Sequence, residues 1–219
     1  MSPLMSLDDR KVWLSGVKHL KKQDPKLRLL MEKVGRFDFD RSGAEGYYEF
    51  LVASIVYQQI AGNAARAILG RFKGLYNGNY PTPRQYLNTR RSAVRSAGLS
   101  PQKISYIKDL SERIVSGRLD LKKISKGEDE KIIEELDEVR GIGRWTAEMF
   151  LIFSLRRVDV LPFDDLGVQK AIQKVYRLRK LPSNERMEKL RAAWRPYCSI
   201  ATLYLWRSQA AKKEGPNKN

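Results

Sequence analysis

Two arginines and two glycines surround a short turn, Arg140-Gly141-Ile142-Gly143-Arg144. Because glycine lacks a β-carbon, such a turn can adopt positive φ and bring its backbone N–H groups against a phosphate. The N-terminus of a following helix adds partial positive charge, which the arginines would supplement. The pattern predicts a phosphate-binding turn. An ordinary helix–helix corner with a capping glycine is the alternative for these residues alone.

A pair of carboxylates, Asp164 and Asp165, follows Pro162 and precedes an amphipathic stretch. A carboxylate in this position can accept hydrogen bonds from the first backbone N–H groups of a helix, so the spacing alone favours N-capping. A fixed anion can also stabilise positive charge that develops during a reaction. The spacing leaves open which aspartate has which role.

The elements that hold these residues are predicted to be helices, because nearly every periodic stretch has helical spacing and none alternates cleanly. The fold class is therefore all-α. Residues 136–150 form a helix, the glycine turn and a second helix, and the apolar run 145–155 indicates burial. Gly62 is expected near the end of the helix that contains Phe50, and Ser125 is expected to cap the helix that reaches Val139.

The chain is strongly basic, with 42 Lys and Arg against 25 Asp and Glu and a formal charge of +17. A field of this sign attracts polyanions, so nucleic acid is the leading partner. A basic surface that serves only solubility and an anionic membrane are the alternatives. Cys198 is the only cysteine, which excludes an intrachain disulfide, a thiolate zinc site and a four-cysteine iron–sulfur cluster.

The sequence shows no signal peptide, and no window approaches the roughly 18 uncharged apolar residues of a membrane span. We expect an intracellular protein without a membrane partner, cytoplasmic at the nucleoid in a prokaryote or nuclear in a eukaryote. A monomer is the default expectation.

Several segments together resemble the helix-hairpin-helix DNA glycosylases, specifically the 3-methyladenine DNA glycosylase II branch. The resemblance rests on VRGIGRWTAEMF followed by LPFDDLGVQKAI, and on KHLKKQDPKLRLLMEKVG, SIVYQQIAGNAARAI, AGLSPQKISYIKDL and WRPYCSIATLYLW. It covers about residues 18–208. It implies two helical subdomains with an active-site cleft between them. We expect an N-terminal segment (1–46) packed with a C-terminal segment (166–210), a central bundle (47–165) with the hairpin at 136–150, and a disordered tail (211–219).

The resemblance implies that Asp165 is the catalytic carboxylate. Departure of a base leaves positive charge on the sugar, and a fixed anion stabilises that state and helps to position the attacking water. An alkylated purine is already a good leaving group, so little acid catalysis is needed. His19, the only histidine, is expected to be a surface or packing residue.

In relatives that also nick the strand, the resemblance places a nucleophilic lysine where this chain has Trp145. An indole cannot form a Schiff base, so we expect a monofunctional enzyme without lyase activity. No cofactor and no metal ion are expected for the reaction, although the carbonyls of the hairpin turn could hold a monovalent cation.

A base that is flipped out of the duplex can be held by stacking on aromatic side chains. The candidates for this base pocket are Trp145, Trp194, Tyr197 and Tyr57. Core packing is the alternative for each of them, and the favoured one for Trp206. The chain departs from the family at Met149 and Cys198, so the preferred base among alkylated bases is not predicted.

The resemblance assigns DNA contacts to the hairpin and to two loops. The residues are Gly141, Gly143, Arg140 and Arg144 in the hairpin, Gln59 in one loop, and Leu99 and Lys103 in the other. Local packing is the alternative for Leu99, hydrogen bonds to the backbone for Gln58 and Gln59, and solvated charge for Lys103, Arg66 and Arg71.

Together these features predict a monofunctional glycosylase that removes alkylated bases of the 3-methyladenine type from duplex DNA in base excision repair. The alternatives are a glycosylase of the same fold for oxidised, deaminated or mismatched bases, and a non-catalytic protein that binds damaged DNA.

Overall fold

The structure is a computed structural model that describes residues 5–37 and 46–210. These residues form helices, as the periodicity predicts, and β pairing among them is limited to one isolated bridge between Ser6 and Arg157. None of the helices in these two ranges has the length and apolar character needed to cross a membrane. The chain divides into two compact units, residues 1–43 with 151–219 and residues 44–150.

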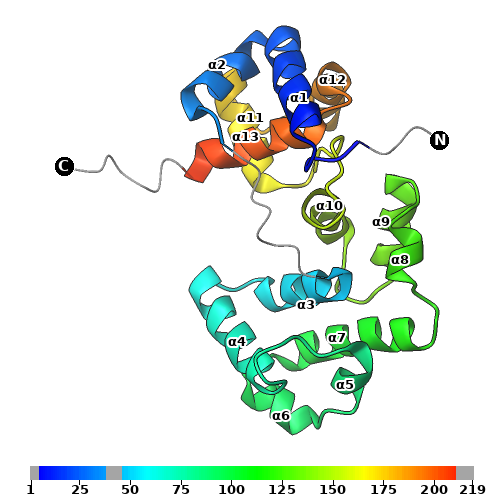
Figure 1. The fold of residues 1–219 in the computed structure, drawn as a ribbon. Coiled ribbons are helices and arrows are strands. Elements are labelled where there is room, and N and C mark those ends of the chain that lie inside the picture. Colours follow the sequence, from blue (N-terminus) through cyan, green and yellow to red (C-terminus); the bar gives the residue numbers. More distant parts are fainter. Residues whose placement is uncertain (1–4, 38–45, 211–219) are drawn as a thin grey trace. The chain divides into compact units, whose positions relative to one another are not determined.

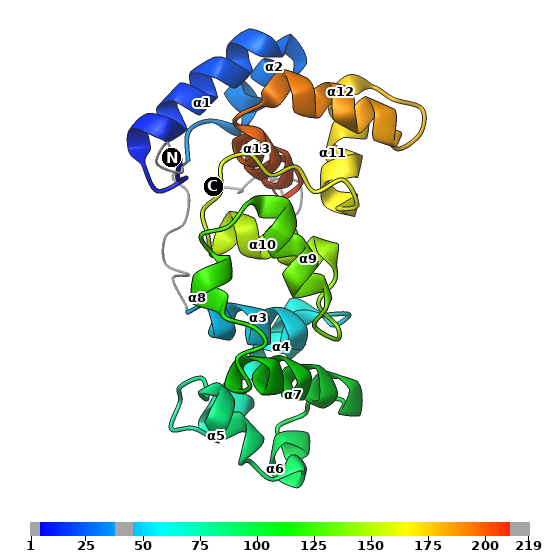
Figure 2. The same ribbon diagram turned by 90° about the vertical axis from the view of Figure 1, so that its right-hand side faces the viewer.

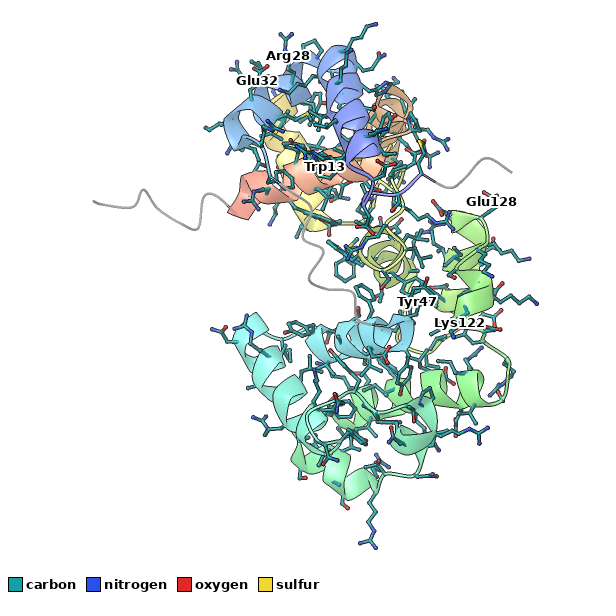
Figure 3. The ribbon with its side chains drawn as sticks, viewed as in Figure 1. Trp13, Arg28, Glu32, Tyr47, Lys122 and Glu128 are labelled. Carbon is teal, nitrogen blue, oxygen red and sulfur yellow. The ribbon has the colours of Figure 1, made fainter. Side chains whose placement is uncertain are left out.

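The unit formed by the two ends of the chain is built around its last helix. Its helices are α1 (Arg10–Gln23), α2 (Pro25–Val34), α11 (Leu166–Tyr176), α12 (Asn184–Trp194) and α13 (Cys198–Ala210). Helix α13 contacts α1, α2, α11 and α12, and Figure 1 shows it surrounded by them. On its apolar faces Ile200, Ala201 and Leu205 are fully buried. Tyr204 stacks on Trp13 of α1, which is labelled in Figure 3.

Asp24 ties the helices of this unit together. Its Oδ1 caps α2 by accepting from the backbone N–H groups of Lys26 and Leu27 at 3.0 and 2.9 Å. Its Oδ2 accepts from the Tyr176 hydroxyl of α11 and from the Trp194 indole of α12. Because the carboxylate is buried, these four donors compensate for its loss of hydration.

The second unit is arranged around α7 (Pro101–Val115). Helix α7 contacts α3 (Tyr47–Tyr57), α5 (Pro83–Leu87) and α6 (Arg91–Ser96), and α4 (Gly62–Gly74) packs on α3. Figure 2 shows α7 between the short helices α5 and α6 on one side and α3 on the other. The remaining helices are α8 (Leu121–Ile124), α9 (Asp129–Asp137) and α10 (Arg144–Phe153), whose last three residues belong to the first unit.

Helix α10 is anchored in the second unit by aromatic contacts. The Phe150 ring lies 5.4 Å from the ring of Tyr47, labelled in Figure 3, and 5.9 Å from the ring of Phe50. Ala147 and Phe150 are fully buried, so the apolar run of α10 is buried as its composition indicates.

Three expectations about boundaries were wrong. Gly62 begins α4 instead of ending α3, and Ser125 is the C-cap of α8 instead of the N-cap of α9. Residues 151–165, assigned to the central bundle, belong to the unit of the chain ends. The reason is hydrogen bonding: Leu7 donates to the Arg156 carbonyl and Ser199 to the Val158 carbonyl, both at 2.9 Å. The expected tail, 211–219, lies outside the described residues.

Candidate functional site

Asp165 is the N-cap of α11. Its Oδ1 accepts from the backbone N–H of Val168 at 2.7 Å, and its own carbonyl accepts from the N–H of Gln169 at 2.9 Å. The residue is 9% exposed. A carboxylate at a helix N-terminus lies at the positive end of the helix dipole, which stabilises its negative charge. The residue that the resemblance identifies as catalytic is thus held rigidly on a helix end.

The turn before α11 distinguishes the two neighbouring aspartates. Asp165 N–H donates to the Pro162 carbonyl at 3.3 Å, and the Gln169 side-chain amide donates to the Phe163 carbonyl at 2.7 Å. This folded turn directs Asp165 toward the helix, whereas Asp164 is exposed. Capping therefore belongs to Asp165, a division that the spacing had left open.

A residue that sequence reasoning assigned to core packing contacts this carboxylate. Trp206 of α13 donates its indole N–H to Asp165 Oδ1 at 2.9 Å. Its ring stacks on Phe153 with 5.6 Å between centroids and an interplanar angle of 16°. Trp206 is half-buried. The sequence contains one signal, which is that a buried indole N–H needs a hydrogen-bond acceptor. Helical periodicity cannot identify a carboxylate 41 positions away as that acceptor.

The aromatic candidates for a base pocket have different surroundings. Trp194 is fully buried and donates to Asp24, so its assignment to a pocket wall was wrong: it is a core residue of its unit. Tyr197 is half-buried and packs against His19 at 5.3 Å. Trp145 and Tyr57 are exposed by 45% and 40% and lie in the other unit.

The hairpin turn needs glycine at one of its two glycine positions. Gly141 has φ +83°, and a β-carbon there would overlap the ring of Tyr106. Gly143 has no positive φ, and the nearest atom to a β-carbon would be Asp137 Oδ1 at 3.8 Å. Between them Ile142 is buried and anchors the turn in the unit's interior.

The two hairpin arginines differ in their partners. Arg144 forms an ion pair with Glu130 of α9 and another with Glu148 at 3.7 Å. The hydrogen bond to Glu130 raises the pKa of the Arg144 guanidinium. Arg140 is exposed, and its backbone N–H donates to Asp109 Oδ2 of α7 at 3.0 Å. Its side chain lines a hollow of about 480 Å³ beside α5 and α7.

The loop between α3 and α4 is bonded to the hairpin turn. The Gln58 side-chain amide donates to the Gly141 carbonyl at 2.7 Å, which brings the two segments of this unit together. The next residue, Gln59, is exposed and has φ +56°, a conformation that costs about 1–3 kcal/mol in a non-glycine residue. Ile60 beside it is 36% exposed. Strain of this kind is frequent in loops that bind a partner.

The other proposed DNA-probing loop has a structural role. Leu99 is fully buried, so it cannot serve as a wedge in this conformation. Arg71 donates to the Ala97 carbonyl at 3.0 Å and Arg95 to the Leu99 carbonyl at 2.6 Å. Lys103 donates to the Val56 carbonyl at 2.8 Å, and burial lowers the pKa of its ammonium group. These cations stabilise helix ends and turns.

Among the residues that the structure describes, no group of three or more His, Cys, Asp or Glu side chains could hold a metal ion. The oxygen atoms of the hairpin turn are backbone carbonyls, of which the Val139 carbonyl accepts from the Ile142 N–H at 3.0 Å. The Gly141 carbonyl accepts from Gln58. A carbonyl has two lone pairs, so each can accept one hydrogen bond and still have a lone pair for a second interaction.

Comparison with known proteins places this arrangement in a family. The chain is 36% identical over 193 residues to DNA-3-methyladenine glycosylase 1 of Schizosaccharomyces pombe, with 87% of this chain and 85% of the relative covered. It is similar to the S. pombe 3-methyladenine DNA glycosylase in complex with abasic DNA (TM-score 0.80, 33% identity, 94% and 100% covered). It also resembles a DNA-3-methyladenine glycosidase from Bacillus halodurans (TM-score 0.82, 35% identity, 97% and 95% covered).

The resemblance inferred from the sequence is confirmed by these similarities and by a family match that spans both the hairpin and Asp165. The match covers residues 52–196. The chain belongs to the HhH-GPD superfamily of base excision DNA repair proteins.

Proposed function

We propose that this protein is a monofunctional DNA glycosylase that hydrolyses the N-glycosidic bond of alkylated bases of the 3-methyladenine type in duplex DNA. The proposal rests on the position of Asp165. Its carboxylate is buried at a helix N-terminus, and its Oδ1 accepts hydrogen bonds from the Val168 N–H and the Trp206 indole. The relatives named above, which are 3-methyladenine glycosylases, support the choice of substrate.

The reaction balances with a carboxylate and water. When the bond between the sugar and the base breaks, its electron pair leaves with the base, and an alkylated cationic base departs neutral. The sugar becomes a cation, which the fixed charge of Asp165 stabilises without moving. Water then adds to the sugar carbon and loses a proton, for which Asp165 is the acceptor. The base needs no proton, so no acid catalyst is required.

Trp145 supports the monofunctional assignment. A glycosylase that also cleaves the strand forms an imine between a lysine amine and the sugar. Trp145 stands at the position where the resemblance places that lysine, and indole nitrogen is not nucleophilic. The expected product is an intact strand with an abasic site.

The hairpin unit is proposed to bind the DNA backbone. The N-terminus of α10, the exposed Arg140 and the strained loop at Gln59 supply donors and positive charge for phosphates. The exposed rings of Trp145 and Tyr57 are suited to stack on bases. A monovalent cation at the turn carbonyls would add charge beside a phosphate, and the remaining lone pairs of these carbonyls fit such an ion.

The test is release of free base from methylated duplex DNA, with alkali treatment afterwards to reveal abasic sites. Asp165→Asn should abolish release while binding to abasic duplex survives, and Asp164→Asn, a matched change at the exposed neighbour, should retain activity. Strand cleavage before alkali would contradict the monofunctional assignment. If wild type binds methylated duplex DNA but releases no base, alkylated bases are rejected as the substrate class. Oxidised or deaminated bases would then be tested.

A further inference from the structure

Two donors from different parts of the chain converge on one oxygen of Asp165. One is the Val168 N–H in the same helix, at 2.7 Å, which any N-cap residue would find. The other is the Trp206 indole N–H, contributed by α13 at 2.9 Å. A single donor leaves a carboxylate able to rotate about that bond, whereas two donors from fixed directions restrict it. The hydrogen bond from Trp206 is not needed for helix capping, so it has to be explained by another role of Asp165.

The indole that makes this bond is itself held in place. Its face stacks on Phe153 at 5.6 Å and 16°. The residues before it in α13, Tyr204 and Leu205, are buried at 3% and 0% exposure, so the backbone that carries Trp206 is part of the packed interior. Holding a donor in a stacked, packed ring reduces the motion that would otherwise weaken its hydrogen bond.

Gly167 leaves space for the Asp165 oxygen that accepts the indole bond. A β-carbon on Gly167 would lie 3.0 Å from Asp165 Oδ1, and 3.4 and 3.6 Å from two atoms of the Trp206 ring. Gly167 has no positive φ and lies inside α11, where glycine is a poorer helix former than alanine. Its backbone conformation therefore does not explain the glycine, but the position of Asp165 Oδ1 does, because a β-carbon would lie at ordinary contact distance from the indole and closer than that to the carboxylate oxygen.

We infer that Trp206 is a positioning residue for the Asp165 carboxylate and that Gly167 provides the space in which Oδ1 meets the indole N–H. The inference rests on the proposed function of Asp165. The hydrogen bond fixes the direction of the carboxylate, so that its charge faces the sugar cation in the transition state without prior reorganisation. The effect is on the chemical step and not on affinity for DNA.

The first experiment compares wild type with Trp206→Phe, which keeps a ring on Phe153 but removes the N–H donor. We expect single-turnover base release at saturating enzyme to fall about 10- to 100-fold, the range found for partners that orient metal-binding side chains. The dissociation constant for abasic duplex should change less than about twofold. Trp13→Phe, at a stacked tryptophan of the same unit, is the matched control and should retain the rate. Equal rates for Trp206→Phe and wild type would overturn the inference.

The second experiment observes the bond without activity. The chain has four tryptophans, so the indole region of a ¹H–¹⁵N spectrum holds four signals, and the one missing in Trp206→Phe is Trp206. In Asp165→Ala this signal should move upfield and lose protection from exchange, because its acceptor is gone. An unmoved signal would refute the contact. If wild type releases no base, the proposed function fails, whereas the spectrum still decides on the bond.

The third experiment is Gly167→Ala. Its methyl group would crowd Asp165 Oδ1 and should displace this oxygen from the indole N–H, lowering the single-turnover rate about as far as Trp206→Phe does, and the Trp206 indole signal should shift in the same direction. The double variant should be no slower than either single variant, because both remove the same bond. Rates that multiply in the double variant would show that the two residues act separately and would reject the role assigned to Gly167.

Discussion

Gly141 allows a test of the hairpin geometry because a β-carbon at this position would cause both backbone strain and a steric overlap. At φ +83° a residue with a β-carbon is strained by about 1–2 kcal/mol. The new methyl group would also overlap the Tyr106 ring, which must then move and weaken the 2.6 Å hydrogen bond between its hydroxyl and Gln102. Overpacking of this kind costs about 1–3 kcal/mol. We therefore expect Gly141→Ala to lower the free energy of unfolding by about 2–5 kcal/mol.

Gly143→Ala is the matched control, since it makes the same chemical change two residues away. There φ is not positive, and the new methyl group would approach Asp137 Oδ1 no closer than 3.8 Å, an ordinary contact. Its effect on stability should stay within about 0.5 kcal/mol. The assay is urea denaturation of both variants, combined with amide hydrogen exchange in α9 and α10, because two units need not unfold in a single transition.

The two costs at Gly141 can be separated in a Tyr106→Ala background. Truncation of the ring removes the overlap and leaves the backbone strain, so Gly141→Ala should then cost only about 1–2 kcal/mol. If Gly141→Ala and Gly143→Ala have the same urea midpoint and the same exchange rates, the reasoning from φ and from the Tyr106 contact is refuted. If the cost persists in full without the ring, the overlap contributes nothing.

Four further measurements test other parts of the structure. Asp24→Ala should cost about 3 kcal/mol or more in calorimetry, because it removes a cap and the acceptor of two buried donors; an unchanged melting temperature would contradict this. Leu99→Ala should cost about 2–5 kcal/mol in urea denaturation yet leave DNA affinity intact, since the side chain is buried. Arg140→Ala should reduce the slope of log Kd against log salt by about 1; an unchanged slope would exclude a phosphate contact. Stability should fall above pH 10.0, the ordinary tyrosine pKa, because burial raises the pKa of Tyr48 and the unfolded chain loses its phenol proton first; Tyr48→Phe should flatten this decline in urea midpoints.

The sequence predicted the helical class, the family and the hairpin because these depend on local patterns. Helical periodicity identifies buried faces, and the stretch around Gly141 combines a turn signal with an amphipathic helix before it and an apolar helix after it. Helix boundaries were less accurate. Ser125 has a side chain that could cap the next helix, and acidic residues follow it. It is nevertheless the C-cap of the short helix α8, so it does not begin α9.

The roles of the large side chains could not be predicted from local patterns. Trp194 ends a charged amphipathic helix and Trp206 lies in a more apolar one, but neither pattern identifies the hydrogen-bond partner of the indole. What separates them is the acceptor that folding brings near: Asp24, 170 positions away, for the first, and Asp165 for the second. Leu99 likewise has the sequence context of a loop-tip residue. In the structure it is buried, and Arg71 and Arg95 donate hydrogen bonds to the carbonyls of Ala97 and Leu99 in the same turn.

Capping and catalysis, which compete as explanations of Asp165 in the sequence, are compatible in the structure. The cap bond from Val168 places the carboxylate at the positive end of α11, and the indole bond fixes its direction. An anion that stabilises a transient cation must already be in place, because reorganising it during the reaction would add to the barrier. A helix N-cap supplies that fixed placement. The capping role therefore supports the assignment of Asp165 as the catalytic residue instead of weakening it.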